Sequence, residues 1–340
     1  MDMKPGTPDR HGLVDSFGRR VTYLRISVTD RCDFRCTYCM SEHMQFLPKK
    51  DVLSFEEIET IADRFISRGV SKIRLTGGEP LVRKDIMSLV ERLGSRIGAS
   101  GLQELTLTTN GSQLARLAPA LAAAGIRRVN VSLDTQRPER FREITRRGNI
   151  HDVLEGISAA MASGLAVKIN MVALRDINDD EIEPMLHWAH SIGCSLTLIE
   201  AMPLGEVQMD RVGQHLPLSE VHARLQKSLT LRPLQKKTGG PARYFSVAET
   251  GGELGYITPF SHNFCESCNR VRLTCTGQLY MCLGQDSMVD LRAALRQDGG
   301  EGLDRALDLA MLLKPRGHDF DLGRNGDQPA VKRHMSVTGG

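Results

Sequence analysis

Six short runs rich in apolar and β-branched residues alternate with longer helical segments between residues 20 and 200. Strands that alternate with helices pair in parallel through right-handed crossovers, so the fold is restricted to a doubly wound sheet or a barrel. One intervening helix has clear ends, because Ser54 and Glu57 form a capping box and Gly69 supplies the stop. The expected strands are VTYLRIS (21–27), KIRLT (72–76), ELTLTT (104–109), RRVNVSL (127–133), AVKINMV (166–172) and SLTLIE (195–200).

One face of the first five strands is polar when every second residue is read together. A doubly wound sheet buries both faces, and a closed barrel fills its interior with Val, Ile and Leu. We therefore expect an α/β fold with an incomplete (βα)6 TIM-like barrel, whose interior holds a ligand. The alternative is that these side chains lie at strand ends, bonded to loop groups. The face consists of Arg25, Ser27, Lys72, Arg74, Thr106, Thr108, Asn130, Ser132, Lys168 and Asn170.

The alternation of strands and helices ends after residue 203. We expect the barrel, with an N-terminal extension and a linker, over residues 1–235, a smaller C-terminal region over 236–325, and a tail ending in Gly-Gly over 326–340. The smaller region contains four expected antiparallel strands and two covering helices. The strands are RYFSVA, ELGYIT, RVRLT and QLYMCL, and the helices are MVDLRAALRQ and LDRALDLAMLLK.

Composition excludes several classes of protein. With 41% hydrophobic residues in a chain of 340, a sizeable core can form. The net charge of +3, without a dense Lys/Arg run, argues against a nucleic-acid partner. No leader-like stretch opens the chain, and no run approaches the roughly 20 apolar residues of a membrane span. We therefore expect a cytoplasmic protein without a membrane partner.

Seven of the eight cysteines form two clusters, which in a reducing compartment indicates metal chemistry. Cys32, Cys36 and Cys39 suit an iron-sulfur cubane with one open iron, since a zinc site needs four ligands and His43 is the only other candidate nearby. Zinc or buried, inert cysteines are the alternatives. The second set is Cys265, Cys268 and Cys282, and Cys275 between them could complete a four-cysteine zinc ribbon.

The CxxxCxxC motif before an alternating barrel resembles the radical S-adenosylmethionine superfamily, and TGGEP (76–80) resembles its element for the methionyl amine. The resemblance implies a [4Fe-4S] cluster on the first three cysteines, with S-adenosylmethionine on the open iron. Read alone, GGEP would be a plain turn, and each further contact could be packing. The implied cofactor contacts are Tyr38, Gly78, Glu79, Ser132 and Met202.

The second cysteine set and the motifs LRISVTDRCDFRCTYCM, KIRLTGGEPL, LTTNG, NVSLD and CNRVRLT are similar to the GTP 3′,8-cyclase family, nearly end to end. This resemblance implies a second [4Fe-4S] cluster on Cys265, Cys268 and Cys282, without Cys275. It further implies a lyase that uses S-adenosylmethionine to cyclise GTP to (8S)-3′,8-cyclo-7,8-dihydroguanosine 5′-triphosphate, the first step of molybdenum cofactor biosynthesis. A flavodoxin or ferredoxin type electron donor, a downstream cyclic pyranopterin monophosphate synthase and, as an open option, a homodimer are the implied partners.

Six cations are expected around one cavity: four on the polar strand face, together with Arg270 and Arg272 beside the second cysteine set. We take this face of the five strands to carry no acidic residue, and unpaired buried charges cost several kcal/mol each, so we expect a bound triphosphate. Pairing with buried Asp or Glu is the alternative. The resemblance gives Arg270 and Arg272 a catalytic role as well. The implied GTP contacts are Arg25, Lys72, Arg74, Thr108, Lys168, Arg270, Val271 and Arg272.

Two positions depart from the family pattern. Thr197 stands where many members have an arginine, and the tail HMSVTGG keeps only the terminal Gly-Gly. In the family this tail reaches the active site, whereas a frayed end is the usual state of a chain terminus. A radical enzyme with another substrate, such as a peptide maturase, and a non-catalytic iron-sulfur or zinc scaffold are the competing functions.

Overall fold

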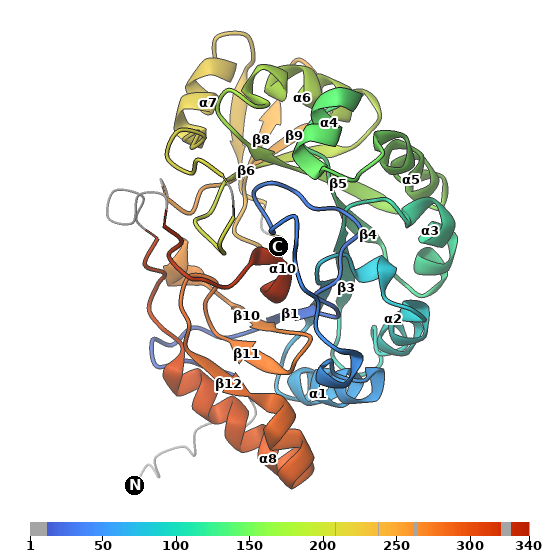
Figure 1. The fold of residues 1–340 in the computed structure, drawn as a ribbon, viewed down its shortest axis with the longest axis vertical. Helices are drawn as coiled ribbons and strands as arrows, with labels where there is room; N and C mark the ends of the chain where they lie inside the picture. Colours follow the sequence, from blue (N-terminus) through green and yellow to red (C-terminus); the bar gives the residue numbers. More distant parts are fainter. Residues whose placement is uncertain (1–11, 208, 237, 261–263, 321–327, 340) are drawn as a thin grey trace, which may run out of the picture.

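A computed structural model describes residues 12–207, 209–236, 238–260, 264–320 and 328–339. Its centre is a row of six parallel strands in chain order, which curves around an interior (Figure 1). All six expected strands are present within two residues of their predicted ends. They are β1 (Tyr23–Ser27), β2 (Lys72–Thr76), β3 (Glu104–Thr109), β4 (Arg128–Ser132), β5 (Ala166–Ala173) and β6 (Ser195–Glu200).

Helices cover the outer face of this curved sheet (Figure 1). The predicted capping box is formed, since Glu57 N donates to Ser54 Oγ at 3.1 Å and Ser54 N donates to Glu57 Oε2 at 2.8 Å. Gly69, just beyond the helix, has a φ of 94°, which favours glycine. The helices are α1 (Phe55–Ser67), α2 (Ile86–Gly94), α3 (Leu114–Ala123), α4 (Pro138–Thr145), α5 (Ile150–Ala162), α6 (Ile182–Ser191), α7 (Leu218–Leu225), α8 (Leu291–Leu313) and α10 (Met335–Thr338).

The sheet continues at both sides with strands from the C-terminal part of the chain, in the order β12-β11-β10-β1-β2-β3-β4-β5-β6-β9-β8-β7. Because its end strands are β12 and β7, the barrel is incomplete, as the polar strand face predicted. The added strands are β7 (Leu231–Leu234), β8 (Arg243–Val247), β9 (Glu253–Ile257), β10 (Arg270–Leu273), β11 (Gln278–Tyr280) and β12 (Met288–Asp290).

Three expectations for this part of the chain need correction. The strands β9 and β10 are antiparallel to β8 and β11, as expected, but each also pairs in parallel with the barrel, on β6 and β1 respectively. Residues 288–290, expected in a helix, form the edge strand β12, and residues 231–234 form β7, which the sequence did not indicate. Edge strands this short carry too few residues to show an alternating pattern.

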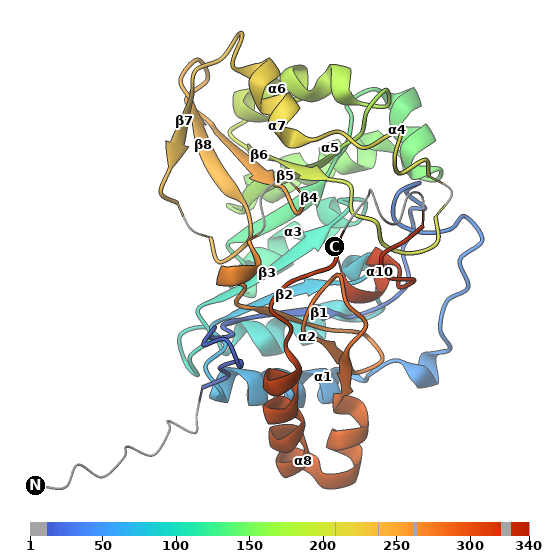
Figure 2. The same ribbon diagram turned by 90° about the vertical axis from the view of Figure 1, so that its left-hand side faces the viewer.

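Alternation along the strands separates the core from the interior. On β1, Leu24 and Ile26 are fully buried in the core that the strands share with the helices, whereas Arg25 points to the other side and lines a cavity. The last helix, α10, lies inside the curve of the sheet near β1 (Figures 1 and 2). Among the described residues, no helix combines the length and apolar character that crossing a membrane requires.

Candidate active site

The loops at the carboxyl ends of the strands surround a first cavity. Parallel strands present their carboxyl ends on one side, where ligands of this class of fold bind. Cys32, Cys36 and Cys39 lie in its wall beside Gly78 and Glu79, together with Tyr38, Ser132 and Met202. The structure therefore brings the three cysteines and all five predicted cofactor contacts to one cavity.

Glycines hold the TGGEP segment against the cysteine loop. A Cβ built on Gly78 would overlap the carbonyl oxygen of Arg31, and one built on Gly77 would crowd that of Thr29. Gly78 N donates to Thr29 O and Glu79 N donates to Arg31 O, both at 2.8 Å. Close approach of two backbones, which only glycine permits, thus sets the spacing between this segment and the cysteines.

Glu79 is almost completely buried, and its carboxylate is largely occupied by protein donors. Thr109 Oγ1 and Leu81 N donate to Oε1 at 2.8 and 3.0 Å, and Asn110 N donates to Oε2 at 2.6 Å. Burial raises the pKa of Glu79 to about 8, against the lowering effect of these hydrogen bonds. Since a carboxylate oxygen offers two lone pairs, one acceptor position on Oε2 is left for a ligand ammonium.

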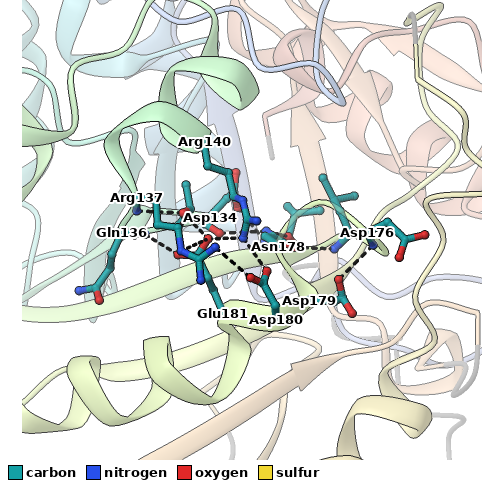
Figure 3. A network of polar contacts seen from close by, with 12 residues as sticks. Asp134, Gln136, Arg137, Arg140, Asp176, Asn178, Asp179, Asp180 and Glu181 are labelled. Atoms are coloured by element: carbon teal, nitrogen blue, oxygen red, sulfur yellow. Dashed lines mark hydrogen bonds and ion pairs between the residues drawn. The ribbon is translucent and has the colours of Figure 1, made fainter.

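Tyr38 and Asp134 form a hydrogen bond across the first cavity. Tyr38 Oη donates to Asp134 Oδ2 at 2.7 Å, and Val172 N donates to Oδ1 at 2.8 Å. Behind Asp134, Asn178 Nδ2 donates to the Asp134 carbonyl at 2.9 Å, within the polar network of Figure 3. Burial raises the pKa of Asp134 to about 6, although both hydrogen bonds lower it. The network fixes the loop after β4 at the cavity wall.

The donors of the first cysteine set suit a multi-iron cluster. Burial raises the pKa of the Cys39 thiol to about 11 and that of Cys36 well above its ordinary value, so iron is needed to hold them as thiolates. Among the residues that the structure describes, no three Cys, His, Asp or Glu side chains converge as closely as one metal ion requires. Three cysteines leave a zinc ion one ligand short of four, whereas three thiolates can hold a [4Fe-4S] cluster with one open iron.

A second cavity adjoins the first. The residues that line both are Asn170, Ile199, Met202 and Met335. Five of the six predicted cations line this second cavity. They are Arg25, Arg74, Lys168, Arg270 and Arg272.

Strand register brings three of these cations into one row. Arg25 on β1 is paired with Arg74 on β2 and with Arg272 on β10, so three arginines stand on neighbouring strands. Burial, followed by the charge of Arg270, lowers the pKa of Arg272 to about 10, and burial followed by Arg272 lowers that of Arg25 well below its usual range. Burial and then Arg74 lower the pKa of Lys168 to about 7. Such mutual repulsion is relieved by a polyanionic ligand.

Lys72 does not lie where the sequence analysis expected it, among the cations of the second cavity. Its Nζ lies 2.7 Å from Glu104 Oε2 and donates to Thr238 O at 2.8 Å, and it does not line the second cavity. Glu104 also pairs with Arg128 at 2.6 Å. Because Glu104 stands two residues before Thr106, it belongs to the polar strand face, which was wrongly taken to have no acid. Lys72 is therefore paired with a carboxylate, which was the alternative to a bound triphosphate.

Two further predicted GTP contacts lie elsewhere. Thr108 lines the first cavity rather than the second, and accepts a hydrogen bond from Arg74 Nη1 at 3.3 Å. Val271 is 1% exposed and its side chain belongs to the core, because it alternates with Arg270 and Arg272 along β10. Only the backbone of Val271 could face a nucleotide.

The second cysteine set lies in the wall of the second cavity. Cys265, Cys268 and Cys282 line it, whereas Cys275 does not. The Cys275 thiol packs near Asp30 and Arg83, and its carbonyl accepts from Leu53 N at 2.7 Å. Burial would raise the pKa of Cys268, but Arg270 and Lys314 lower it to about 7. Cys275 therefore does not join the other three cysteines at this cavity.

The C-terminal tail enters the interior, as the resemblance implied (Figure 2). Arg272 Nη1 donates to Gly339 O at 2.7 Å, and Ser336 lines the first cavity. Gly339 has a φ of 73°, and a Cβ there would overlap Thr76 Oγ1, so the penultimate residue must be glycine. Gly340 lies outside the described residues.

Several cavity residues were not singled out from the sequence. Asp134 lies in the quoted motif NVSLD, two residues beyond Ser132, and the alternation along a strand could have indicated it. Asn110 lies in the motif LTTNG, two residues beyond Thr108, and the same alternation could have indicated it. Tyr244 lines the second cavity, and its Oη accepts from Lys168 Nζ at 2.7 Å. Lys314 does not line either cavity but touches Cys268. Both come from distant segments, and the sequence pattern did not indicate them.

Comparisons with known proteins agree with this geometry. A model of the radical SAM superfamily matches residues 26–189, and a model described as Molybdenum Cofactor Synthesis C matches residues 194–320. The crystal structure of Streptococcus suis SuiB bound to S-adenosylmethionine covers 93% of this chain and 77% of its own, with a TM-score of 0.62 at 14% identity, which shows a shared fold.

Curated relatives share the whole length of the chain. The GTP 3′,8-cyclase of Rhizobium etli is 61% identical over 337 residues, which are 99% of this chain and 97% of that protein. The GTP 3′,8-cyclase of Brucella canis is 60% identical and covers 96% of each chain. The fold and the first cavity thus define a radical S-adenosylmethionine protein with a [4Fe-4S] cluster. Within that superfamily, the chain belongs to the GTP 3′,8-cyclase family.

Proposed function

We propose that this protein catalyses the S-adenosylmethionine-dependent cyclisation of GTP to (8S)-3′,8-cyclo-7,8-dihydroguanosine 5′-triphosphate, the first step of molybdenum cofactor biosynthesis. One observation carries the proposal. Two cavities adjoin, each is lined by three cysteines, and five cations line the one farther from the CxxxCxxC loop. In this proposal residues 1–235 supply the barrel, 236–325 the second-cluster region and 326–340 the tail.

The first cavity holds the cofactor. Cys32, Cys36 and Cys39 would hold a [4Fe-4S] cluster, and when bound, the cluster and S-adenosylmethionine supply the radical that removes hydrogen from C3′ of GTP. Glu79 lines this cavity and would accept the methionyl ammonium at the remaining lone pair of Oε2. Tyr38 and Asp134 orient the adenosyl end, with Ser132 and Met202 completing the wall.

The second cavity holds GTP. Arg25, Arg74, Arg272 and Lys168 take the triphosphate, since this ligand supplies the negative charge and the acceptors that the cavity needs. Met202 lines both cavities, so the ribose of GTP can face the first one. Arg270 and Arg272 also stabilise charge during cyclisation.

A second [4Fe-4S] cluster on Cys265, Cys268 and Cys282 would bind the guanine base at its open iron. The enclosed setting excludes water from the substrate, and positioning, rather than acid-base chemistry, is the protein's contribution. A flavodoxin or ferredoxin type protein would supply electrons, and a cyclic pyranopterin monophosphate synthase would take the product. A homodimer is the last part of the proposal.

The test is an anaerobic assay of the reconstituted protein with GTP deuterated at C3′. We expect cleavage of S-adenosylmethionine to depend on GTP and deuterium to appear in 5′-deoxyadenosine. The Cys32→Ala variant is the control, because it loses a ligand of the first cluster. Cleavage by the wild-type protein that ignores GTP and transfers no deuterium would assign another substrate to this chain.

A further inference from the structure

Lys314 is a buried lysine at the end of α8, and its ammonium faces the second cysteine set. The residue is 2% exposed. Its Nζ lies 3.5 Å from Cys268 Sγ, 3.1 Å from Met281 O and 3.3 Å from Arg270 O. Three acceptors match the three protons of an ammonium, so every donor of the group has a partner.

The charge of Lys314 lacks a carboxylate partner in the part of the chain that the structure describes. The ion pairs found there involve other lysines, such as Lys72 with Glu104 and Lys236 with Glu253. A buried charge costs several kcal/mol unless an opposite charge offsets it. Of the three groups that the ammonium touches, only the Cys268 sulfur can carry a negative charge.

The three contacts also tie together the pieces that build the second cavity. Arg270 begins β10, Met281 follows β11, and Cys268 and Cys282 stand beside them in the chain. Lys314, at the end of α8, thus bonds to the first residue of β10, to the residue that follows β11, and to the predicted cluster ligand Cys268. Hydrogen bonds to cluster sulfurs and nearby positive charge are known determinants of cluster potential.

We propose that Lys314 is a positioning residue of the second cluster, which holds the Cys268 thiolate and offsets the negative charge of the iron-bound sulfurs. The inference rests on the second cluster of the proposed function. It has two consequences. The cluster is retained more firmly, and its midpoint potential is higher than it would be without the ammonium.

A simpler role has to be separated from this one. Lys314 is also the residue that ends α8, where its backbone N donates to Met311 O at 3.4 Å. If the side chain served only to join α8 to the strands, a neutral hydrogen-bonding side chain could replace it without a change of potential. A readout that follows charge rather than folding is therefore required.

The test uses full-length protein in which Cys32, Cys36 and Cys39 are replaced by Ala, so that only the second set can hold iron. In this background we compare Lys314 with Lys314→Met, Lys314→Gln and Lys314→Arg. Iron and sulfide per chain, the rate of iron loss to a chelator, and the midpoint potential from an EPR-monitored redox titration are measured. Circular dichroism reports folding.

We expect Lys314→Met and Lys314→Gln to lower the midpoint potential and to lose iron several-fold faster, with Lys314→Arg closer to the parent. Unchanged potential and iron loss in the folded Gln variant would overturn the role of Lys314 alone. A parent that binds zinc or no iron would overturn the second cluster and the role of Lys314 together. If Lys314→Met does not fold, the Gln and Arg variants decide the question.

Discussion

Replacing Lys168 with Met should stabilise the ligand-free protein while weakening GTP binding. Lys168 is 8% exposed and its Nζ has Tyr244 Oη as a neutral partner, at 2.7 Å. Burial, followed by the charges of Arg74 and other cations, lowers its pKa from 10.5 to about 7. Because burial disfavours its charged form, Lys168 destabilises the folded protein at every pH at which it stays protonated.

The size and sign of the effect follow from the two pKa values. One pKa unit equals 1.36 kcal/mol, so keeping Lys168 charged costs the folded state about 4 to 5 kcal/mol below pH 7. Between the folded and the unfolded pKa, the unfolded state binds more protons, and the stability contribution of Lys168 therefore improves as the pH rises. At pH 9 the remaining cost is about 2 kcal/mol.

The assay is denaturant unfolding of ligand-free Lys168→Met and wild-type protein at pH 6 and pH 9. Loss of the hydrogen bond to Tyr244 destabilises the variant by about 1 kcal/mol. We therefore expect Lys168→Met to be more stable than wild type by about 3 kcal/mol at pH 6 and by less at pH 9. The matched control is Lys236→Met, since Lys236 lies near the same ring but is exposed and paired with Glu253 at 2.6 Å.

GTP binding to the same proteins supplies the second half of the prediction. Hydrogen bonds to charged groups contribute about 1.5 to 3 kcal/mol, so Lys168→Met should raise the Kd for GTP by about 10- to 100-fold, measured by anaerobic calorimetry. A Lys168→Met protein that is less stable than wild type at pH 6, or whose stability difference does not change with pH, would refute the reasoning. The Lys236→Met control should leave both quantities nearly unchanged.

Three further substitutions test the remaining parts of the site. Gly78→Ala should push the TGGEP segment away from the cysteine loop, because the new Cβ would overlap Arg31 O. Measured as iron per chain, the iron bound by the first cysteine set should then fall by more than half. Tyr38→Phe leaves Asp134 Oδ2 without its 2.7 Å donor, so the free energy of unfolding should fall by about 1 to 2 kcal/mol. The same variant should bind S-adenosylmethionine more weakly, and unchanged binding would contradict an orienting role. Cys275→Ser should leave iron per chain unchanged and bind no zinc, whereas loss of metal would restore the ribbon hypothesis.

Local sequence patterns determined much of the fold. The six barrel strands, the capping box of α1 and the polar interior could be predicted because alternation, capping residues and glycine stops act over a few neighbouring residues. The two cysteine sets were equally visible, since the cysteines of each set lie close together in the chain. That the barrel is incomplete also followed from sequence, because a closed barrel cannot bury so many polar side chains.

Only the tertiary structure decided which charges meet. Strand register places Arg25 between Arg74 and Arg272, and it sets Lys72 opposite Glu104, with which Lys72 forms an ion pair. Spacing within one strand cannot show which residue stands opposite on the next, and the energy of a buried charge depends on that neighbour. For the same reason Lys314, 46 residues from Cys268 in the chain, became visible as its partner only once α8 was placed against β11 and β12.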